Sequence, residues 1–91
     1  MTAFELLICN QLGLHARAAS KLVSIASRFA SESKLEVMAT GLVANCKSIM
    51  GLMMLGASYG TPIKIHVEGD DESDASNAIY ELIANRFYEE N

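Results

Sequence analysis

IKIHVE, the stretch at residues 63–68, alternates apolar and polar side chains without interruption. Successive side chains of a strand point to opposite faces of its sheet, so this pattern predicts a strand with one buried and one exposed face. Similar alternation marks residues 4–8 and residues 34–38. After a turn at residues 40–41, residues 42–44 complete a predicted hairpin with residues 34–38. The sequence therefore predicts four half-buried strands, which is typical of an antiparallel sheet.

Three segments between and after these strands have the features of helices. Residues 16–31 carry an apolar stripe at helical spacing, and residues 72–87 carry a second one after a run of acidic residues. Residues 49–55 form a shorter apolar segment preceded by a serine. The element order is therefore βαββαβα. We predict an α+β fold, an open-faced β-sandwich in which helices pack on one face of a four-stranded antiparallel sheet.

Length and composition indicate one folded domain. The chain has 91 residues, of which 51% are hydrophobic and 20% are charged, and this balance excludes a disordered chain. A chain of this size can bury one modest core. No linker, low-complexity tract or internal repeat divides the sequence, so we expect a single domain over residues 1–91.

The net charge and the two cysteines narrow the class of protein and its cellular compartment. The net charge is −4 and no basic run is present, which argues against partners that are nucleic acid or anionic membrane. The longest apolar stretch, residues 49–57, is too short to span a bilayer, and residues 1–5 lack the positive region of a signal peptide. Cys9 and Cys46 form no C-x-x-C motif, so no disulfide framework is predicted. We expect a reduced, cytoplasmic protein.

His15 is the first candidate functional residue. It follows a Gly-Leu pair and precedes the helix predicted from Ala16, which places it near the N-cap. The first N–H groups of a helix lack intrahelical partners, and the helix dipole favours an anion there. A phosphoryl group on the imidazole would meet those donors, and the Arg17 guanidinium could bind its oxygens. The other interpretation is a polar residue that only caps the helix, and spacing does not decide between the two.

Ser48 and the apolar segment after it also allow two interpretations. Ser48 suits the N-cap of residues 49–55, which the residues alone favour, but it is also a candidate for regulatory phosphorylation. The segment carries more apolar groups than a short helix can bury on one face. Part of it is therefore predicted to be core, whereas Met50 with Ile49 or Met53 is a candidate exposed patch for partner proteins.

The remaining polar and thiol residues are predicted to be structural. His66 alternates with charged residues on the polar face of its strand, so we expect it to be solvated. Cys9 and Cys46 are interpreted as buried or inert thiols, and the scattered His and Cys residues predict no metal site. Four acidic residues are interpreted as charges at a helix start rather than as catalytic pairs: Asp70, Asp71, Glu72 and Asp74.

Two separate motifs, GLHAR at residues 13–17 and KSIMG at residues 47–51, closely resemble those of the HPr family, the histidine-containing phosphocarriers of the bacterial phosphotransferase system. The resemblance covers essentially the whole chain in length and in element order. The family fold is an open-faced β-sandwich, which agrees with the order predicted from the residues. The resemblance implies a phosphocarrier rather than a stand-alone enzyme, acting as a monomer without cofactor or metal.

The resemblance also implies roles for individual residues. His15 would accept a phosphoryl group, through Nδ1, from phosphorylated Enzyme I and pass it to IIA-type proteins or domains. Arg17 would assist phosphate handling, together with the backbone N–H groups of Ala16 and Arg17. Ser48 matches the serine that a dedicated HPr kinase/phosphorylase modifies in many bacteria.

Three further residues match the family pattern, and two positions depart from it. Ile49, Met50 and Met53 match the hydrophobic patch that docks onto Enzyme I and other partners. The family usually has proline after the arginine, whereas this chain has Ala18, a good helix former for which we expect a small effect. Leu42 stands where many relatives carry a polar or basic residue, and it bears on recognition by a serine kinase.

Two other functions are compatible with parts of the sequence. One is a regulatory interaction module of the same fold, which acts through Ser48 and its docking surface. Related proteins of that kind lack the active histidine. The presence of His15 with Arg17 therefore argues against regulation as the sole role of this chain. The other is a small phosphatase-like enzyme that uses Arg17 and the helix start as a phosphate cradle. No general acid or water-positioning group is evident for such an enzyme. The sequence favours the carrier.

Overall fold

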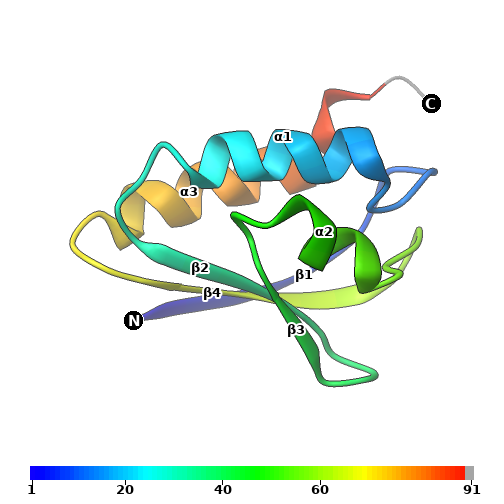
Figure 1. Ribbon diagram of the computed structural model, residues 1–91, viewed down its shortest axis with the longest axis horizontal. Helices are drawn as coiled ribbons and strands as arrows, with labels where there is room; N and C mark the ends of the chain where they lie inside the picture. Colours follow the sequence, from blue (N-terminus) through cyan, green and yellow to red (C-terminus); the bar gives the residue numbers. More distant parts are fainter. Residues whose placement is uncertain (90–91) are drawn as a thin grey trace.

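The framework of the molecule is a four-stranded antiparallel sheet, seen in the computed structural model, which describes residues 1–89 (Figure 1). Its strands are β1 (Thr2–Leu7), β2 (Glu32–Val37), β3 (Leu42–Asn45) and β4 (Pro62–Glu68). They are ordered β1-β4-β2-β3 across the sheet. The strand with the clearest sequence pattern, β4, is therefore central, and it pairs with β1 on one side and with β2 on the other.

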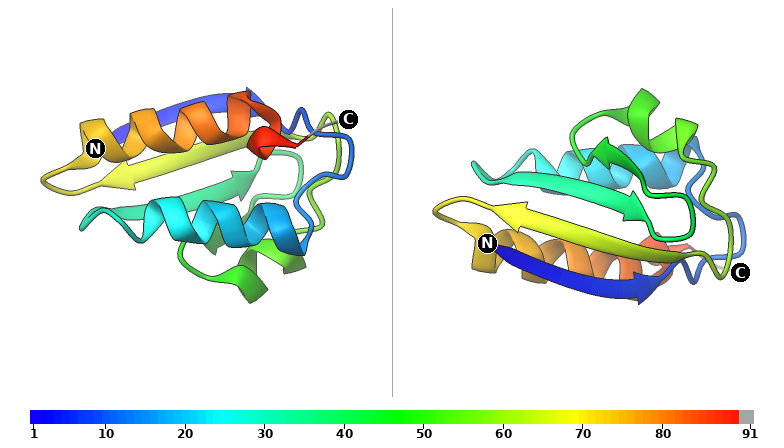
Figure 2. Two further views of the ribbon diagram at one scale, coloured as in Figure 1. Left: turned by 90° about the horizontal axis from the view of Figure 1, so that it is seen from above. Right: turned by 90° about the horizontal axis from the view of Figure 1, so that it is seen from below.

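Three helices cover one face of this sheet. They are α1 (Ala16–Ala26), α2 (Ile49–Met54) and α3 (Glu72–Ala84), and a single 3-10 turn, η1 (Arg86–Tyr88), follows α3. The two long helices, α1 and α3, lie side by side above the sheet, while the opposite face is left uncovered (Figure 2). The predicted α+β fold with element order βαββαβα is confirmed.

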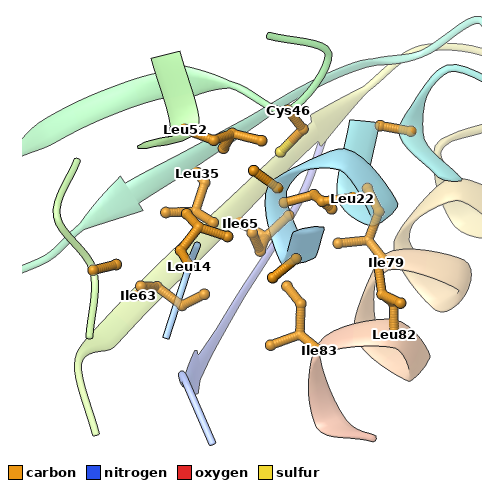
Figure 3. Close-up of a cluster of buried hydrophobic side chains, with 14 of the residues drawn as sticks. Leu14, Leu22, Leu35, Cys46, Leu52, Ile63, Ile65, Ile79, Leu82 and Ile83 are labelled. Carbon is orange, nitrogen blue, oxygen red and sulfur yellow. The ribbon is translucent and has the colours of Figure 1, made fainter. Parts of the chain in front are cut away.

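The core lies between the sheet and the helices. The inward residues of β4 are buried, as predicted from the alternation at residues 63–68. Side chains of the three helices converge on them and on Leu35 of β2 (Figure 3). Fully or almost fully buried residues of this cluster include Leu22, Leu52, Ile63, Ile65, Ile79, Leu82 and Ile83. Burial of a side chain of this size contributes about 1.5–3 kcal/mol, so this layer supplies the main stabilisation of the fold.

The first helix is shorter than predicted. Its apolar stripe extends toward Ser31, but α1 ends at Ala26. The reason lies outside the helix, because the carboxylate of Asp71 accepts hydrogen bonds from the N–H groups of Ala30 (2.8 Å) and Ser31 (2.9 Å) and from the Ser31 hydroxyl. The loop thus finds partners for its backbone without continuing the helix.

The last helix also ends early. It was predicted to reach Phe87, but α3 ends at Ala84, and the next turn is left-handed, with φ of 58° at Arg86, 55° at Phe87 and 57° at Tyr88. Left-handed residues other than glycine cost roughly 1–2 kcal/mol each. Phe87 is fully buried by this turn, and burial of so large a side chain offsets the strain.

Replacement of Phe87 by Ala is expected to lower the free energy of unfolding by about 3–5 kcal/mol, because it empties a fully enclosed site. The matched control is Tyr88→Ala, a neighbouring residue with the same backbone conformation whose side chain is 65% exposed. It should change the free energy of unfolding by less than about 0.5 kcal/mol. Urea denaturation measures both values, and similar losses in the two variants would contradict the anchoring role of Phe87.

The contacts of Asp71 predict a dependence of stability on pH. The hydrogen bond from the Ser31 hydroxyl, and then that from the Ala30 N–H, lowers the pKa of Asp71 from its ordinary value of 3.8. The native carboxyl therefore binds its proton less tightly than the unfolded one. The contribution of Asp71 to stability is fully present at pH values well above 3.8, and it is lost as the pH falls through the lower pKa of the native state.

Asp71→Asn is accordingly expected to lower the urea midpoint at about pH 7 and to lose less stability than the wild-type protein between about pH 5 and pH 2. Asp70→Asn, which makes the same charge change at an exposed neighbour, serves as the control. Parallel pH profiles for wild type and Asp71→Asn would show that this carboxylate does not link the loop to α3.

Candidate functional site

His15 is the N-cap of α1, as predicted. Its backbone is extended, with φ of −82° and ψ of 179°, and its carbonyl accepts the first intrahelical hydrogen bond, from Ala19 N–H at 2.8 Å. Its ring nitrogen Nδ1 accepts the N–H of Arg17 at 3.2 Å. The imidazole thus satisfies one of the backbone donors that the start of a helix leaves without a partner.

A tight loop presents His15 at this position. Gly13 has φ of 69°, and a Cβ placed on it would lie only 2.7 Å from the carbonyl oxygen of Ala57, so the turn requires glycine. The next residue, Leu14, is buried and donates its N–H to the Ala57 oxygen at 2.8 Å. The chain after α2 therefore holds the loop that carries His15.

Asn10 braces the same loop from inside. Its side chain is fully buried, and its Nδ2 donates to the carbonyl of Gly13 at 2.7 Å and to Oε1 of Glu89 at 3.0 Å. A buried amide needs such partners, because an unpaired polar group costs free energy. Asn10 therefore connects the His15 loop to the C-terminal part of the chain.

Glu89, which no sequence pattern indicates, is the partner of His15. Its second carboxylate oxygen, Oε2, pairs with Nε2 of His15. Burial raises the pKa of Glu89. Hydrogen bonds from Asn10 and His15 and the charges of His15 and Lys21 together lower it by more, so the pKa lies below its ordinary value of 4.5. No motif marks this contact, since 74 positions separate the two residues.

Arg17 and Ala18, both in the first turn of α1, have different environments. The side chain of Arg17 is exposed, and no hydrogen bond or ion pair of its guanidinium occurs among residues 1–89. Ala18, one of the two residues that depart from the family pattern, is fully buried and therefore packs against the core. Within residues 1–89 nothing occupies this guanidinium, so it could meet an anion that approaches the start of α1.

Ser48 and α2 form the second part of the candidate site. Ser48 is the N-cap of α2, and its hydroxyl accepts the N–H of Gly51 at 3.0 Å, so the capping interpretation is confirmed. Within α2 only Leu52 is buried. Ile49, Met50 and Met53 are exposed, Met50 to 72%. Met54, which the sequence analysis did not single out, is exposed to 78% and enlarges this apolar surface.

The other residues considered from sequence lie apart from His15. His66 was expected to be solvated, but it is half-buried, and its Nε2 lies 2.9 Å from Oε1 of Glu36, the diagonal neighbour on β2. Both residues line an open hollow of about 490 Å³ on the uncovered sheet face, which shares no residue with the His15 site. The hollow is lined mainly by charged side chains of β2 and β4, whereas His15 lies at the start of α1 on the helix side of the molecule.

The two cysteines have structural environments. Burial raises the pKa of the Cys46 thiol to about 12, which keeps it protonated and inert at neutral pH. The Cys9 thiol donates to the carbonyl oxygen of Ile83 at 3.2 Å. Throughout residues 1–89, no three His, Cys, Asp or Glu side chains are grouped to hold a metal ion, and no helix is long and apolar enough to cross a membrane.

Comparisons with known proteins match this arrangement over almost the whole chain. Residues 2–85 match the family described as the PTS HPr component phosphorylation site. A phosphocarrier protein HPr of Xylella fastidiosa is 48% identical over 90 residues, covering 99% of each chain, and one of Pseudomonas aeruginosa is 47% identical over 89 residues, covering 98% of each. A solved structure of HPr from Thermoanaerobacter tengcongensis superposes with a TM-score of 0.93 at 43% identity and covers both chains completely.

Proposed function

Because this chain belongs to the HPr family, whose members are phosphocarriers of the phosphotransferase system, we propose that His15 is the residue that carries its phosphoryl group. The role of phosphocarrier follows from the family. The proposal for the residue is supported by one observation above all, the position of a partly exposed imidazole at the start of α1, with 28% of its side chain accessible. Anions are stabilised at such helix starts.

The proposed chemistry uses the Nδ1 atom of His15. Its lone pair attacks the phosphorus of a phosphorylated donor, the N–P bond forms, and the bond between phosphorus and the donor breaks with its electron pair leaving on the donor. Before transfer, Nδ1 accepts a hydrogen bond from the Arg17 N–H at 3.2 Å. Once Nδ1 is bonded to phosphorus, the Arg17 N–H can donate to a phosphoryl oxygen instead. The N–H of Ala16 is proposed as a second backbone donor. The exposed Arg17 guanidinium supplies further donors to the same oxygens.

The proposed partners are the proteins that supply and take this group. We propose phosphorylated Enzyme I as the donor and IIA-type proteins or domains as acceptors, met in the cytoplasm. Docking is assigned to the exposed residues of α2, namely Ile49, Met50, Met53 and the adjacent Met54. Flexible methionine side chains adapt to different partner surfaces, which suits a carrier that binds donor and acceptor in turn.

His15→Ala is expected to abolish phosphate acceptance while leaving the fold intact. His66→Ala is the matched control, because it removes the only other histidine and leaves the α1 start unchanged. Each protein is incubated with Enzyme I, magnesium and phosphoenolpyruvate, and its intact mass is measured before and after mild acid. Wild type and His66→Ala should gain one acid-labile phosphoryl group. Acceptance by His15→Ala would refute the assignment, and steady release of inorganic phosphate would favour a phosphatase.

A regulatory role for Ser48 is proposed alongside this transfer. The Ser48 side chain is half-buried at the N-cap of α2, directly before Ile49 and Met50 of the docking surface. A phosphoryl group there would be tolerated by the helix start, yet it would place two negative charges beside an apolar contact surface. An HPr kinase/phosphorylase is the enzyme class we propose for this modification.

Ser48→Asp is expected to slow phosphorylation of His15 by Enzyme I by about tenfold, which corresponds to about 1.4 kcal/mol of lost docking or transition-state stabilisation. Ser73→Asp adds the same charge in the first turn of α3 at an exposed site, and its rate should match wild type. Initial rates of phosphohistidine formation provide the comparison. An equal rate in all three proteins would place the docking surface away from α2.

A further inference from the structure

The two ring nitrogens of His15 have partners of opposite kind. Nδ1 faces a backbone N–H, that of Arg17 at 3.2 Å, and therefore must be the unprotonated nitrogen. Nε2 faces the carboxylate of Glu89, which its lowered pKa keeps ionised at neutral pH. The proton of the neutral imidazole accordingly lies on Nε2, and the lone pair lies on Nδ1.

The backbone that delivers Glu89 to this position is strained and tightly held. Arg86, Phe87 and Tyr88 are all left-handed, a conformation that persists only where the surroundings enforce it. Phe87 is fully buried, and its carbonyl accepts the Lys21 ammonium of α1 at 2.6 Å. The N–H of Glu89 donates to Arg86 at 3.0 Å, which closes the turn. The direction of Glu89 is thus determined by the core.

The carboxylate itself is enclosed and fully engaged. Only 10% of the Glu89 side chain is accessible, compared with 28% for His15. Its Oε1 accepts the Asn10 amide at 3.0 Å while Oε2 pairs with the imidazole. A carboxylate bridged in this way has a fixed orientation and strengthens the hydrogen bond to the histidine, as do the carboxylates that orient histidines in other sites.

We propose that Glu89 is a positioning residue for phosphoryl transfer at His15. This proposal rests on the proposed function of His15. The Glu89 carboxylate accepts the Nε2–H, which keeps the lone pair on Nδ1, the atom beside the helix start. It also fixes the ring plane, because Asn10 holds the other carboxylate oxygen.

The same carboxylate compensates charge during the reaction. When Nδ1 forms its bond to phosphorus and the bond to the donor breaks, the ring retains the Nε2 proton and gains positive charge. Glu89 lies against that proton, so the charge is neutralised without a proton leaving the site. On transfer to an acceptor the N–P bond breaks, its electron pair returns to Nδ1, and the initial pair with Glu89 is restored. Among residues 1–89, the Lys21 ammonium is a further charge that acts on this carboxylate, and it is cationic.

The test compares Glu89→Ala with Glu68→Ala, which removes an exposed carboxylate at the end of β4. Long-range proton–nitrogen correlation spectra at alkaline pH report which ring nitrogen of His15 carries the proton. Stopped-flow measurements with phosphorylated Enzyme I give the transfer rate constant and the KM separately. Thermal unfolding of each variant shows that it is folded, and Glu89→Gln retains the side-chain volume while removing the charge.

Wild type and Glu68→Ala are expected to show the Nε2–H form. Glu89→Ala should show a mixture of both forms and a rate constant lower by about tenfold, as for loss of one hydrogen bond to a charged group. Its KM should remain within about twofold, because the α2 docking residues are untouched. Glu89→Gln should also lose rate, since its amide cannot neutralise the ring.

Three outcomes would overturn the positioning role: an unchanged ring form and rate in Glu89→Ala, a faster rate, or a change in KM alone. If wild-type protein accepts no phosphoryl group on His15, the proposed function fails and the positioning role fails with it. If only the positioning role fails, wild type is phosphorylated normally and Glu89→Ala transfers the group at the same rate, so the two failures can be distinguished.

Discussion

Burial of the apolar face of β4 is the constraint on which the rest of the structure depends. Ile63, Ile65 and Val67 lie between two neighbouring strands and beneath the helices, and together they are almost completely removed from water. This face needs a cover wide enough for the middle of the sheet, which α1 and α3 supply side by side. The positions of both helices, and therefore of the start of α1 and the end of α3, follow from that packing.

The His15 site lies where those two helix ends meet. The start of α1 contributes His15 and Arg17, and the turn after α3 contributes Glu89, while Asn10 joins the two segments inside the protein. Because each contribution is anchored by a buried residue, Leu14 on one side and Phe87 on the other, the imidazole is held by the core rather than by surface contacts alone. Such preorganisation suits a residue that must receive and release a group in the same orientation.

Local patterns were sufficient to predict the sheet, the three helices and the N-cap positions of His15 and Ser48, because alternation, helical spacing and capping act over a few residues. They were insufficient at two helix ends. Ala30 and Ser31 lie outside the helix because their N–H groups bond to Asp71, and Phe87 lies outside it because its side chain is buried in the core. Both outcomes depend on partners far along the chain. Glu89 was missed for the same reason, since its role exists only once the left-handed turn has brought it to His15.

The central position of β4 also has a consequence for the order in which the chain can fold during synthesis. β1 is the first strand made, yet its partner in the sheet is β4, which is the last strand made. While a ribosome is still producing residues 8–61, only the β2–β3 hairpin and the helices can form contacts with nearby sequence. β1 therefore remains unpaired, with its backbone hydrogen-bonding groups exposed, until the final third of the protein, which contains β4, has emerged.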